Sequence, residues 1–273
     1  MSRQSVNRLF AVVGRELTTV VRTRAFLALA GGFAAVVAVL AWTAGAVGYV
    51  PLVLDLLTPV EVLVPALALA FGYRSVLGDD ERGELDVIRT YPVSRATFVL
   101  GVYLGRAAAL LVALVVPLLG VALLVPAFGG VGTTVIASHA AMDSPLLYLR
   151  FVVLTAAFAL VLMGAALAIS TTAGTTRAGI VVAVALGVAL VVGFDAGIVA
   201  GLAGGVVPEG ALELVLALSP NSAFRGLVLE TVVGGVESGA PAASPVASVL
   251  GLLLWLVGTL AVAVVTVWPE SRR

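Results

Sequence analysis

The chain has 273 residues, of which 61% are hydrophobic and only 11% are charged, and its fifteen acidic side chains balance its fifteen basic ones. Its mean hydropathy is +1.19. Because a soluble domain is usually about 25% charged, this composition excludes an ordinary soluble protein and is typical of a polytopic membrane protein. The chain has no cysteine, which excludes disulfides and thiolate metal sites. A lone histidine, His139 in a predicted outer loop, leaves no recognisable zinc cluster.

Residues 5–24 are predicted to form a basic amphipathic helix. At 100° per residue, one stripe collects the apolar side chains Val6, Leu9, Phe10, Val13, Leu17, Val20 and Val21. Arg8, Arg15 and Arg22 lie seven residues apart on the opposite stripe. We expect such a helix to lie in the plane of the membrane. Two roles stay open: a topology anchor, or an elbow helix that leads into the first span beside a partner protein.

Six apolar runs are long enough to cross a membrane, since about 20 helical residues cover about 30 Å of hydrocarbon. They lie near residues 25–47, 56–76, 98–126, 146–169, 178–203 and 248–268. Thr58, Pro59 and Glu61 have the spacing of a capping box, which predicts that the second span begins there. The predicted fold is therefore all-α, a single transmembrane domain over residues 1–273.

The arginines fall almost entirely on one side of these six spans. All basic residues are arginine, and only Arg150 and Arg225 lie in segments of the other side. By the positive-inside rule, both termini and residues 74–97 are predicted to be cytoplasmic. We therefore expect a multi-pass protein of the cell membrane, with the lipid bilayer as a partner and no nucleic acid.

The segment "GDDERGELDVIRTYPVSRATF", residues 78–98, is the most polar stretch of the chain. Eight of the eighteen residues from Gly78 to Arg95 are charged. The pattern predicts a short helix–turn–helix that stops at Tyr91-Pro92, because proline pushes the preceding residue out of the helical region. Ser94 is then placed to cap the next helix. The segment is either a docking surface or a solvated loop that keeps its neighbours out of the lipid.

Ionisable residues in or near the bilayer are functional candidates by default. Glu61 and Asp195 are acidic, Arg150 and Arg225 are basic, and a pair between the two sets is plausible. Each also has a local explanation: Glu61 completes the capping box, Arg150 can reach the membrane surface, and Asp195 lies near the outer end of its span. Residues 205–247 are predicted to hold two short interfacial or re-entrant helices, "PEGALELVLAL" and "SAFRGLVLE", followed by the linker "GGVESGAPAASP".

The stretch "ERGELDVIRTYPVSRATFVLGVYLGR" resembles the cytosolic segment of type-2 ABC transporter permeases. The matching positions are Glu81, Gly83, Leu85, Pro92, Val93, Ser94, Arg95 and Gly101, whereas Glu84, Asp86 and Val102 depart from the family pattern. "GRELTTVVRTRAF" is similar to the family's amphipathic entry, with Glu16, Arg22 and Arg24 matching. The Trp-bearing last span and its basic tail also fit. "LSPNSAFRG", residues 218–226, is similar to the branch associated with maturing the copper site of nitrous oxide reductase.

The resemblance implies a membrane-spanning permease subunit, an exporter that works as a homodimer or heterodimer with a separate ATPase. It implies that the ATPase docks on residues 74–97, with Glu81, Gly83, Glu84, Pro92, Ser94 and Arg95 as coupling residues, and that Arg15, Glu16, Arg22 and Arg24 belong to the elbow helix. Since the chain has no lysine, it cannot build a P-loop. We therefore expect no enzyme activity, metal or cofactor here, and ATP bound by the partner subunit.

Two other classes remain as alternatives. A secondary transporter driven by an ion gradient would place charges at the membrane midplane, often at broken helices. An intramembrane enzyme would need a catalytic motif, and the sequence has no HExxH and no convincing Ser–His pair. The cargo is open between lipid-like molecules, ions, drugs and a copper- or sulfur-related species.

Overall fold

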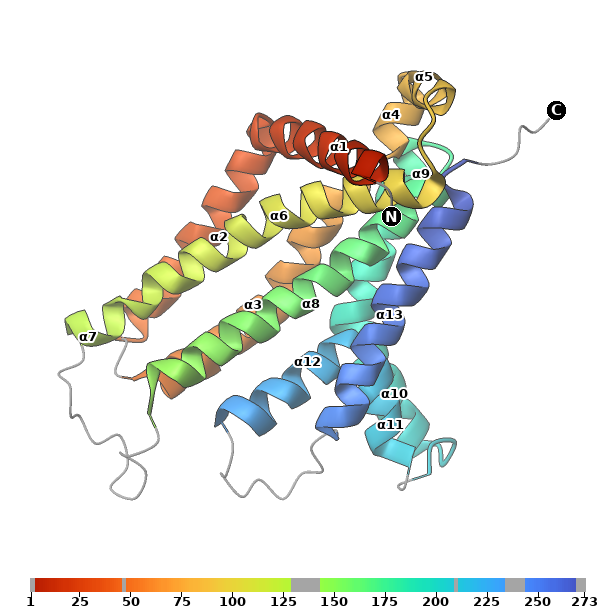
Figure 1. Cartoon of the computed structure of the whole chain (residues 1–273). Helices are drawn as coiled ribbons and strands as arrows, with labels where there is room; N and C mark the ends of the chain where they lie inside the picture. The colour runs from red at the N-terminus through yellow and green to blue at the C-terminus, as the bar shows by residue number, and fades with distance from the viewer. Residues whose placement is uncertain (1–2, 46–47, 129–142, 209–210, 234–243, 269–273) are drawn as a thin grey trace.

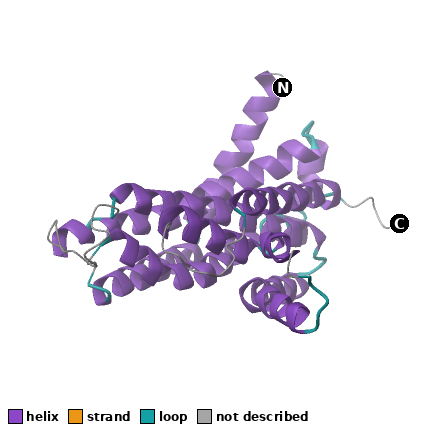
Figure 2. Cartoon of the chain, turned by 90° about the horizontal axis from the view of Figure 1, so that it is seen from below, coloured by secondary structure: helices purple, strands orange, loops and turns teal. Residues whose placement is uncertain are grey.

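The computed structural model describes residues 3–45, 48–128, 143–208, 211–233 and 244–268, and every regular element within these ranges is a helix (Figure 2). Six of its helical segments are long and apolar enough to cross a membrane. They are Arg24–Thr43, Tyr49–Glu81, Arg95–Ala127, Pro145–Thr172, Thr176–Ala203 and Pro245–Thr266. The predicted all-α polytopic fold with six spans is therefore confirmed.

The spans are built from several labelled helices. The first three spans contain α2 (Arg24–Thr43), α3 (Tyr49–Gly72) with α4 (Leu77–Glu81), and α6 (Arg95–Ala122) with α7 (Leu124–Phe128). The last three contain α8 (Pro145–Thr172), then α9 (Thr176–Val188), the π-helical turn η1 (Ala189–Gly193) and α10 (Phe194–Ala203), and finally α13 (Pro245–Thr266). The remaining elements are α1 (Arg3–Val21), α5 (Glu84–Thr90), α11 (Leu212–Leu218), α12 (Pro220–Val228) and the π-helical turn η3 (Leu229–Val233).

The helices gather around α3 and α8, while the short elements lie at the two ends of the bundle. The buried share of a span's most apolar stretch is 67% for α8 and 61% for the span of α3 and α4, but only 17% for α13. At one end, α1 crosses the start of α6 beside α4 and α5 (Figure 1). We call this the charged end. The opposite end carries α11 and α12.

The second span begins ten residues earlier than the capping-box pattern predicts. The first helical residue is Tyr49, so Pro59 and Glu61 lie inside α3, and the predicted cap at Thr58 is wrong. The start of the helix is capped from a distant segment instead. The carboxylate of Asp143 accepts hydrogen bonds from the backbone amides of Tyr49 and Val50 at 3.0 and 2.8 Å. Proline is tolerated inside α3 because neighbouring helices enclose it.

The two short helices predicted near the opposite end are present and bent sharply against each other. The axis of α11 meets that of α12 with η3 at 110°. The indole of Trp255 in α13 donates a hydrogen bond to the carbonyl of Leu218 at 2.9 Å, which fixes the bend against the last span. The predicted linker lies almost entirely outside the described residues, and so does His139.

Small residues bring the central spans close together. Gly72 in α3 faces Ala166 in α8, and a side chain at Gly72 would collide with it. A Cβ at Gly164 would lie 2.8 Å from the hydroxyl of Thr259 in α13. Small residues permit such close helix contacts in membranes. Those of the fourth span are therefore used for packing within one copy of the chain.

Candidate functional site

The charged segment folds as two short helices joined by a left-handed residue. Between α4 and α5, Gly83 has a φ of 71°, and no heavy atom lies within 4 Å of where its Cβ would be. The requirement for glycine is therefore conformational, because a residue with a side chain rarely adopts this backbone. Ser94 caps α6 as predicted, since its hydroxyl accepts a hydrogen bond from the amide of Thr97 at 3.1 Å.

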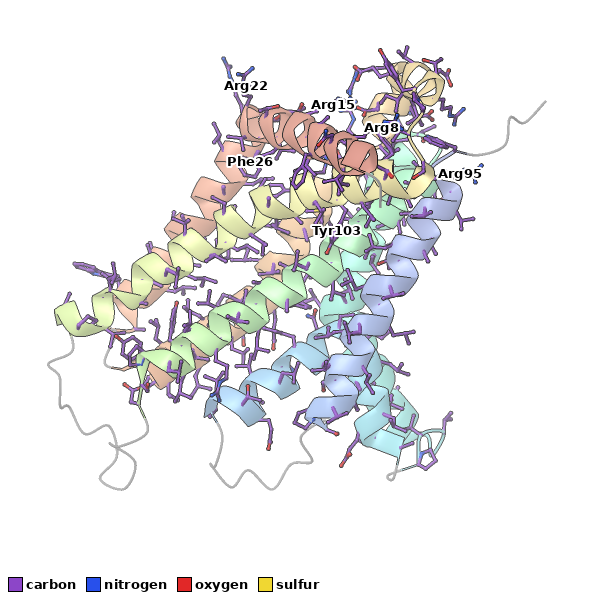
Figure 3. The ribbon with its side chains drawn as sticks, viewed as in Figure 1. Arg8, Arg15, Arg22, Phe26, Arg95 and Tyr103 are labelled. Carbon is purple, nitrogen blue, oxygen red and sulfur yellow. The ribbon has the colours of Figure 1, made fainter. Side chains whose placement is uncertain are left out.

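Two arginines and two carboxylates join this segment to α1. Asp79 is 4% exposed and accepts from Arg15 and Arg82 at 2.9 and 2.5 Å. Glu84 accepts from the same two arginines, at 2.9 Å from Arg15 and 2.7 Å from Arg82. Figure 3 shows Arg15 on the side of α1 that faces the charged segment, whereas Arg22 points away from it. The opposite charges compensate each other within the chain.

A second ion pair fixes α1 on the start of α6. Glu16 is 2% exposed, and its carboxylate accepts from Arg106 at 3.0 Å. Arg106 also donates to the carbonyl of Phe71 in α3 at 2.5 Å. Burial raises the pKa of Glu16, against the opposing effect of the Arg106 charge. The sequence singled out Glu16 through the family pattern but missed Arg106. Arg106 could have been predicted to need an acidic partner, because it lies eleven residues after the start of an apolar helix.

Part of the apolar stripe predicted for α1 is buried in the bundle, and part of it is exposed. Val20 is buried, whereas Phe10 and Val21 stay 67% and 44% exposed. The contact with α6 is made at two glycines of α6. A Cβ at Gly101 would lie 2.6 Å from the side chain of Val12, and one at Gly105 would lie 2.6 Å from Cβ of Glu16. One side of the helix therefore packs on α6 while another stays open.

The remaining predicted coupling residues are also engaged within the chain. Arg8 donates to the carbonyl of Pro92. The guanidinium of Arg95 lies 6.0 Å from the ring centroid of Trp268 at the end of the last span, within range of a cation–π contact. Glu81 contacts Thr176 of α9 and Arg74. The predicted elbow residues Arg22 and Arg24, by contrast, lie exposed at the bend between α1 and α2.

One face of the segment stays open. Val87 is 59% exposed and Tyr91 is 62% exposed, although both are large and apolar. The side chain of Asp86 is 80% exposed, and it pairs with Arg89 at 3.4 Å. Leu85, at 2% exposed, anchors the other face of α5 in the bundle. We call Asp86, Val87 and Tyr91 the open face of α5. It has an apolar centre and a charged rim, which is the composition of an interaction surface.

The contact between the segment and α1 should depend on pH only under acid conditions. The hydrogen bond from Arg82 lowers the pKa of Glu84 below its ordinary value of 4.5. The contact is therefore fully present above that value and is lost as the pH falls through the lowered pKa. Hydrogen exchange of the α5 amides should be constant between about pH 8 and 5, after correction for intrinsic rates, and should rise below about 4.5. In a Glu84→Gln variant, this acid step should disappear.

Three of the four predicted intramembrane residues come together near the opposite end. Glu61 in α3 has a side chain that is only 3% exposed, and it accepts from Nε of Arg225 at 2.8 Å and from Nη2 of the same residue. Arg225 in α12 also lies 3.5 Å from Asp195 in α10. Arg150 does not join them, and donates to the carbonyl of Thr231 at 2.5 Å.

Neighbouring polar groups complete this outer cluster, which we define as Glu61, Asp195 and Arg225. The hydroxyl of Ser222 donates a hydrogen bond to Asp195 at 2.6 Å, and the side-chain amide of Asn221 donates one to the backbone carbonyl of Glu61 at 3.1 Å. The rings of Phe158 and Phe224 stack at 4.7 Å and hold α12 against α8. The cluster thereby links the second span, the fifth span and the bent pair α11–α12.

Metal binding was one possible role for the acidic side chains of these two sites. No group of three or more histidine, aspartate or glutamate side chains in the described ranges could hold a metal ion. Both charged sites instead consist of ion pairs between different helices. Their arrangement suits the holding and moving of helices relative to each other.

The family model described as "ABC-2 family transporter protein" matches residues 10–267. The chain is 30% identical over 118 residues to the "Probable ABC transporter permease protein NosY" of Stutzerimonas stutzeri, a match that covers 41% of this chain and 43% of the relative. It is 32% identical over 141 residues to the protein of the same name from Pseudomonas aeruginosa, covering 44% of this chain and 51% of the relative. The chain thus spans about half the length of the curated relatives it matches.

Proposed function

Because this chain belongs to the ABC-2 family of transporter proteins, we propose that it is the membrane-spanning subunit of an ATP-binding-cassette transporter. It works with a separate ATPase subunit and a second permease copy, and it moves its cargo outward. The charged end faces the cytoplasm, as the distribution of arginines supports. With no lysine in the sequence, the chain depends on its partner to bind and hydrolyse ATP.

The observation that carries this proposal is the contrast between the two faces of the charged segment. Asp79 and Glu84 are held by Arg15 of α1, and Leu85 is buried in the bundle. The open face of α5, by contrast, exposes large apolar side chains at the end of a membrane bundle. Because one face of the segment is fixed to α1 and to the bundle, a protein that binds the exposed face can displace the helices behind it. We assign the open face to the ATPase contact, and we assign to Asp79, Glu84 and Leu85 the transmission of ATPase movement to the spans.

Co-purification tests the proposal. The tagged full-length chain, isolated from its native membranes, should bring down a P-loop ATPase identified by mass spectrometry, and the complex should hydrolyse ATP whereas the chain alone should not. Val87→Ala with Tyr91→Ala should weaken the complex about thirtyfold, because truncated apolar anchors at an interface each cost about 1 kcal/mol or more. Val199→Ala is the matched control, since Val199 is 66% exposed on α10.

Three results would contradict the proposal. One is ATP hydrolysis by the purified chain alone. Another is uptake driven by an ion gradient without ATP in reconstituted vesicles, which would favour a secondary transporter. The third is an ATPase complex that is unaffected by the α5 variants, which would leave the subunit assignment standing and remove the assigned docking face.

A further inference from the structure

The two ends of α4 are held by the corner that joins the fourth span to the fifth. Ser170, near the end of α8, is 1% exposed, and its hydroxyl accepts from the amides of Val76 and Leu77 at 2.9 and 3.0 Å. At the other end of α4, the carboxylate of Glu81 accepts from both the amide and the hydroxyl of Thr176 at 2.7 Å. Ser170 of the corner therefore caps the start of α4, and Glu81 of α4 caps the start of α9.

The start of α9 also packs directly on α4. A Cβ at Gly179 would lie 3.1 Å from Leu77 and 3.5 Å from the ring of Tyr73. The first amides of a helix have no partner within the helix. Thr175 accepts from the amide of Ala178 at 3.2 Å, and Glu81 accepts from that of Thr176. A carboxylate is further favoured at this helix end by the helix dipole.

The other half of the charged segment is held by a different element. Glu84 at the start of α5 pairs with Arg15 of α1, and the carbonyl of Pro92 accepts from Arg8. Asp79 of α4 pairs with Arg15 as well, so the elbow helix holds both α4 and α5, whereas Glu81 joins α4 to the fifth span. The fifth span is also one of the two least enclosed, with 17% of its most apolar stretch buried.

We propose that α4 and the start of α9 form one rigid unit, in which Glu81 is the positioning residue that carries movement of the charged segment to the fifth span. This span runs through the π-helical turn η1 to Asp195, which pairs with Arg225. A displacement at Thr176 is therefore applied to an element that takes part in the outer cluster through Asp195. The source of the movement rests on the proposed function, but the rigid unit itself does not.

A pair of variants can break the link without disturbing either helix. Thr176→Pro removes both donors to Glu81, and proline is favoured at the first position of a helix. Thr175 already has φ −151° and ψ 153°, the extended conformation that a residue before proline requires. Glu81→Ala removes the acceptor. Asp86→Ala is the matched control for the measurement without the ATPase, because it removes a carboxylate of the same segment that pairs only with Arg89 among the described residues.

The first measurement uses the full-length chain in nanodiscs, without an ATPase. The absence of native cysteine allows spin labels at Asp80→Cys and Val181→Cys, and unlabelled chains dilute any contact between copies. The unmodified background and Asp86→Ala should give one narrow distance distribution. Thr176→Pro and Glu81→Ala should add a second population of about a tenth or more. If both variants keep the single narrow distribution, the rigid unit does not depend on Glu81 and the inference is overturned.

The second measurement uses the complex with the co-purified ATPase. Labels at Val199→Cys in α10 and Leu146→Cys in α8 report movement of the fifth span at the opposite end. ATP should shift this distance in the background, and Thr176→Pro should reduce the shift at least about twofold while ATP hydrolysis continues. An undiminished shift in Thr176→Pro would overturn the assigned path. If no ATPase binds, the proposed function fails, and the first measurement still decides whether the unit exists.

Discussion

Replacing Arg225 with alanine should lower the stability of the protein by about 3 kcal/mol. The variant leaves Glu61, whose side chain is 3% exposed, without the guanidinium that contacts both of its carboxylate oxygens. A carboxylate buried without a partner is far more costly than the pair is favourable, so most of the loss comes from the group left behind. Thermal unfolding of the detergent-solubilised chain measures the effect.

Two further variants test this cause. Arg150→Ala removes the same side chain from a site where it contacts only a carbonyl among the described residues, and it should change stability by less than about 1 kcal/mol. The double variant Glu61→Met with Arg225→Met should recover much of the loss, because apolar residues can replace a buried pair with little cost. Equal losses for Arg225→Ala and Arg150→Ala would refute the role of the outer cluster in joining the spans.

Gly105→Ala should release the elbow helix from α6. The added Cβ would lie 2.6 Å from Cβ of Glu16 and 2.9 Å from the carbonyl oxygen of Val13, and a backbone atom cannot turn aside as a flexible side chain can. The helix α1 must therefore shift, at a cost of about 2 kcal/mol for overpacking. The shift also strains the buried pair between Glu16 and Arg106. Hydrogen exchange along α1, together with thermal unfolding, measures the release.

A second glycine of α6 provides the control, because its replacement by alanine should not lower the stability. No heavy atom lies within 4 Å of the position that a Cβ would take at Gly120 in α6. Gly120→Ala should therefore be neutral or stabilise the helix by up to about 1 kcal/mol, because alanine is the better helix former. If Gly105→Ala behaves like Gly120→Ala, the close approach of α1 to α6 does not hold the elbow in place.

The coupling residues show how far a family pattern reaches. The resemblance to type-2 ABC transporter permeases is confirmed by the family match over residues 10–267. The pattern also marked Glu81, Gly83 and Arg95 of the charged segment as coupling candidates. It could not indicate that Glu81 contacts Thr176, 95 positions further along the chain, or that Asp79 pairs with Arg15. The predicted roles of these residues in coupling remain predictions.

For the intramembrane charges too, the sequence marked the residues but not their partners. Their presence in apolar segments marked Glu61, Asp195 and Arg225 as candidates, because such charges need partners. Local spacing then gave Glu61 a wrong place, at the start of a helix that in fact begins at Tyr49. The true cap is the carboxylate of Asp143, which lies more than 90 residues away in the sequence. A capping box is a local pattern, and a longer helix capped from outside overrides it.

The sequence by itself determined the all-helical class, the six spans and the placing of charge at one end of the bundle. These follow from hydropathy summed over about 20 residues, since every backbone amide in a membrane must find a partner within its own helix. Only the tertiary structure decided which arginine meets which carboxylate, that α4 is held by the start of α9, and that α1 approaches α6 at Gly101 and Gly105. Such contacts join residues far apart in the chain, and their partners depend on how the helices pack rather than on any periodicity within one of them.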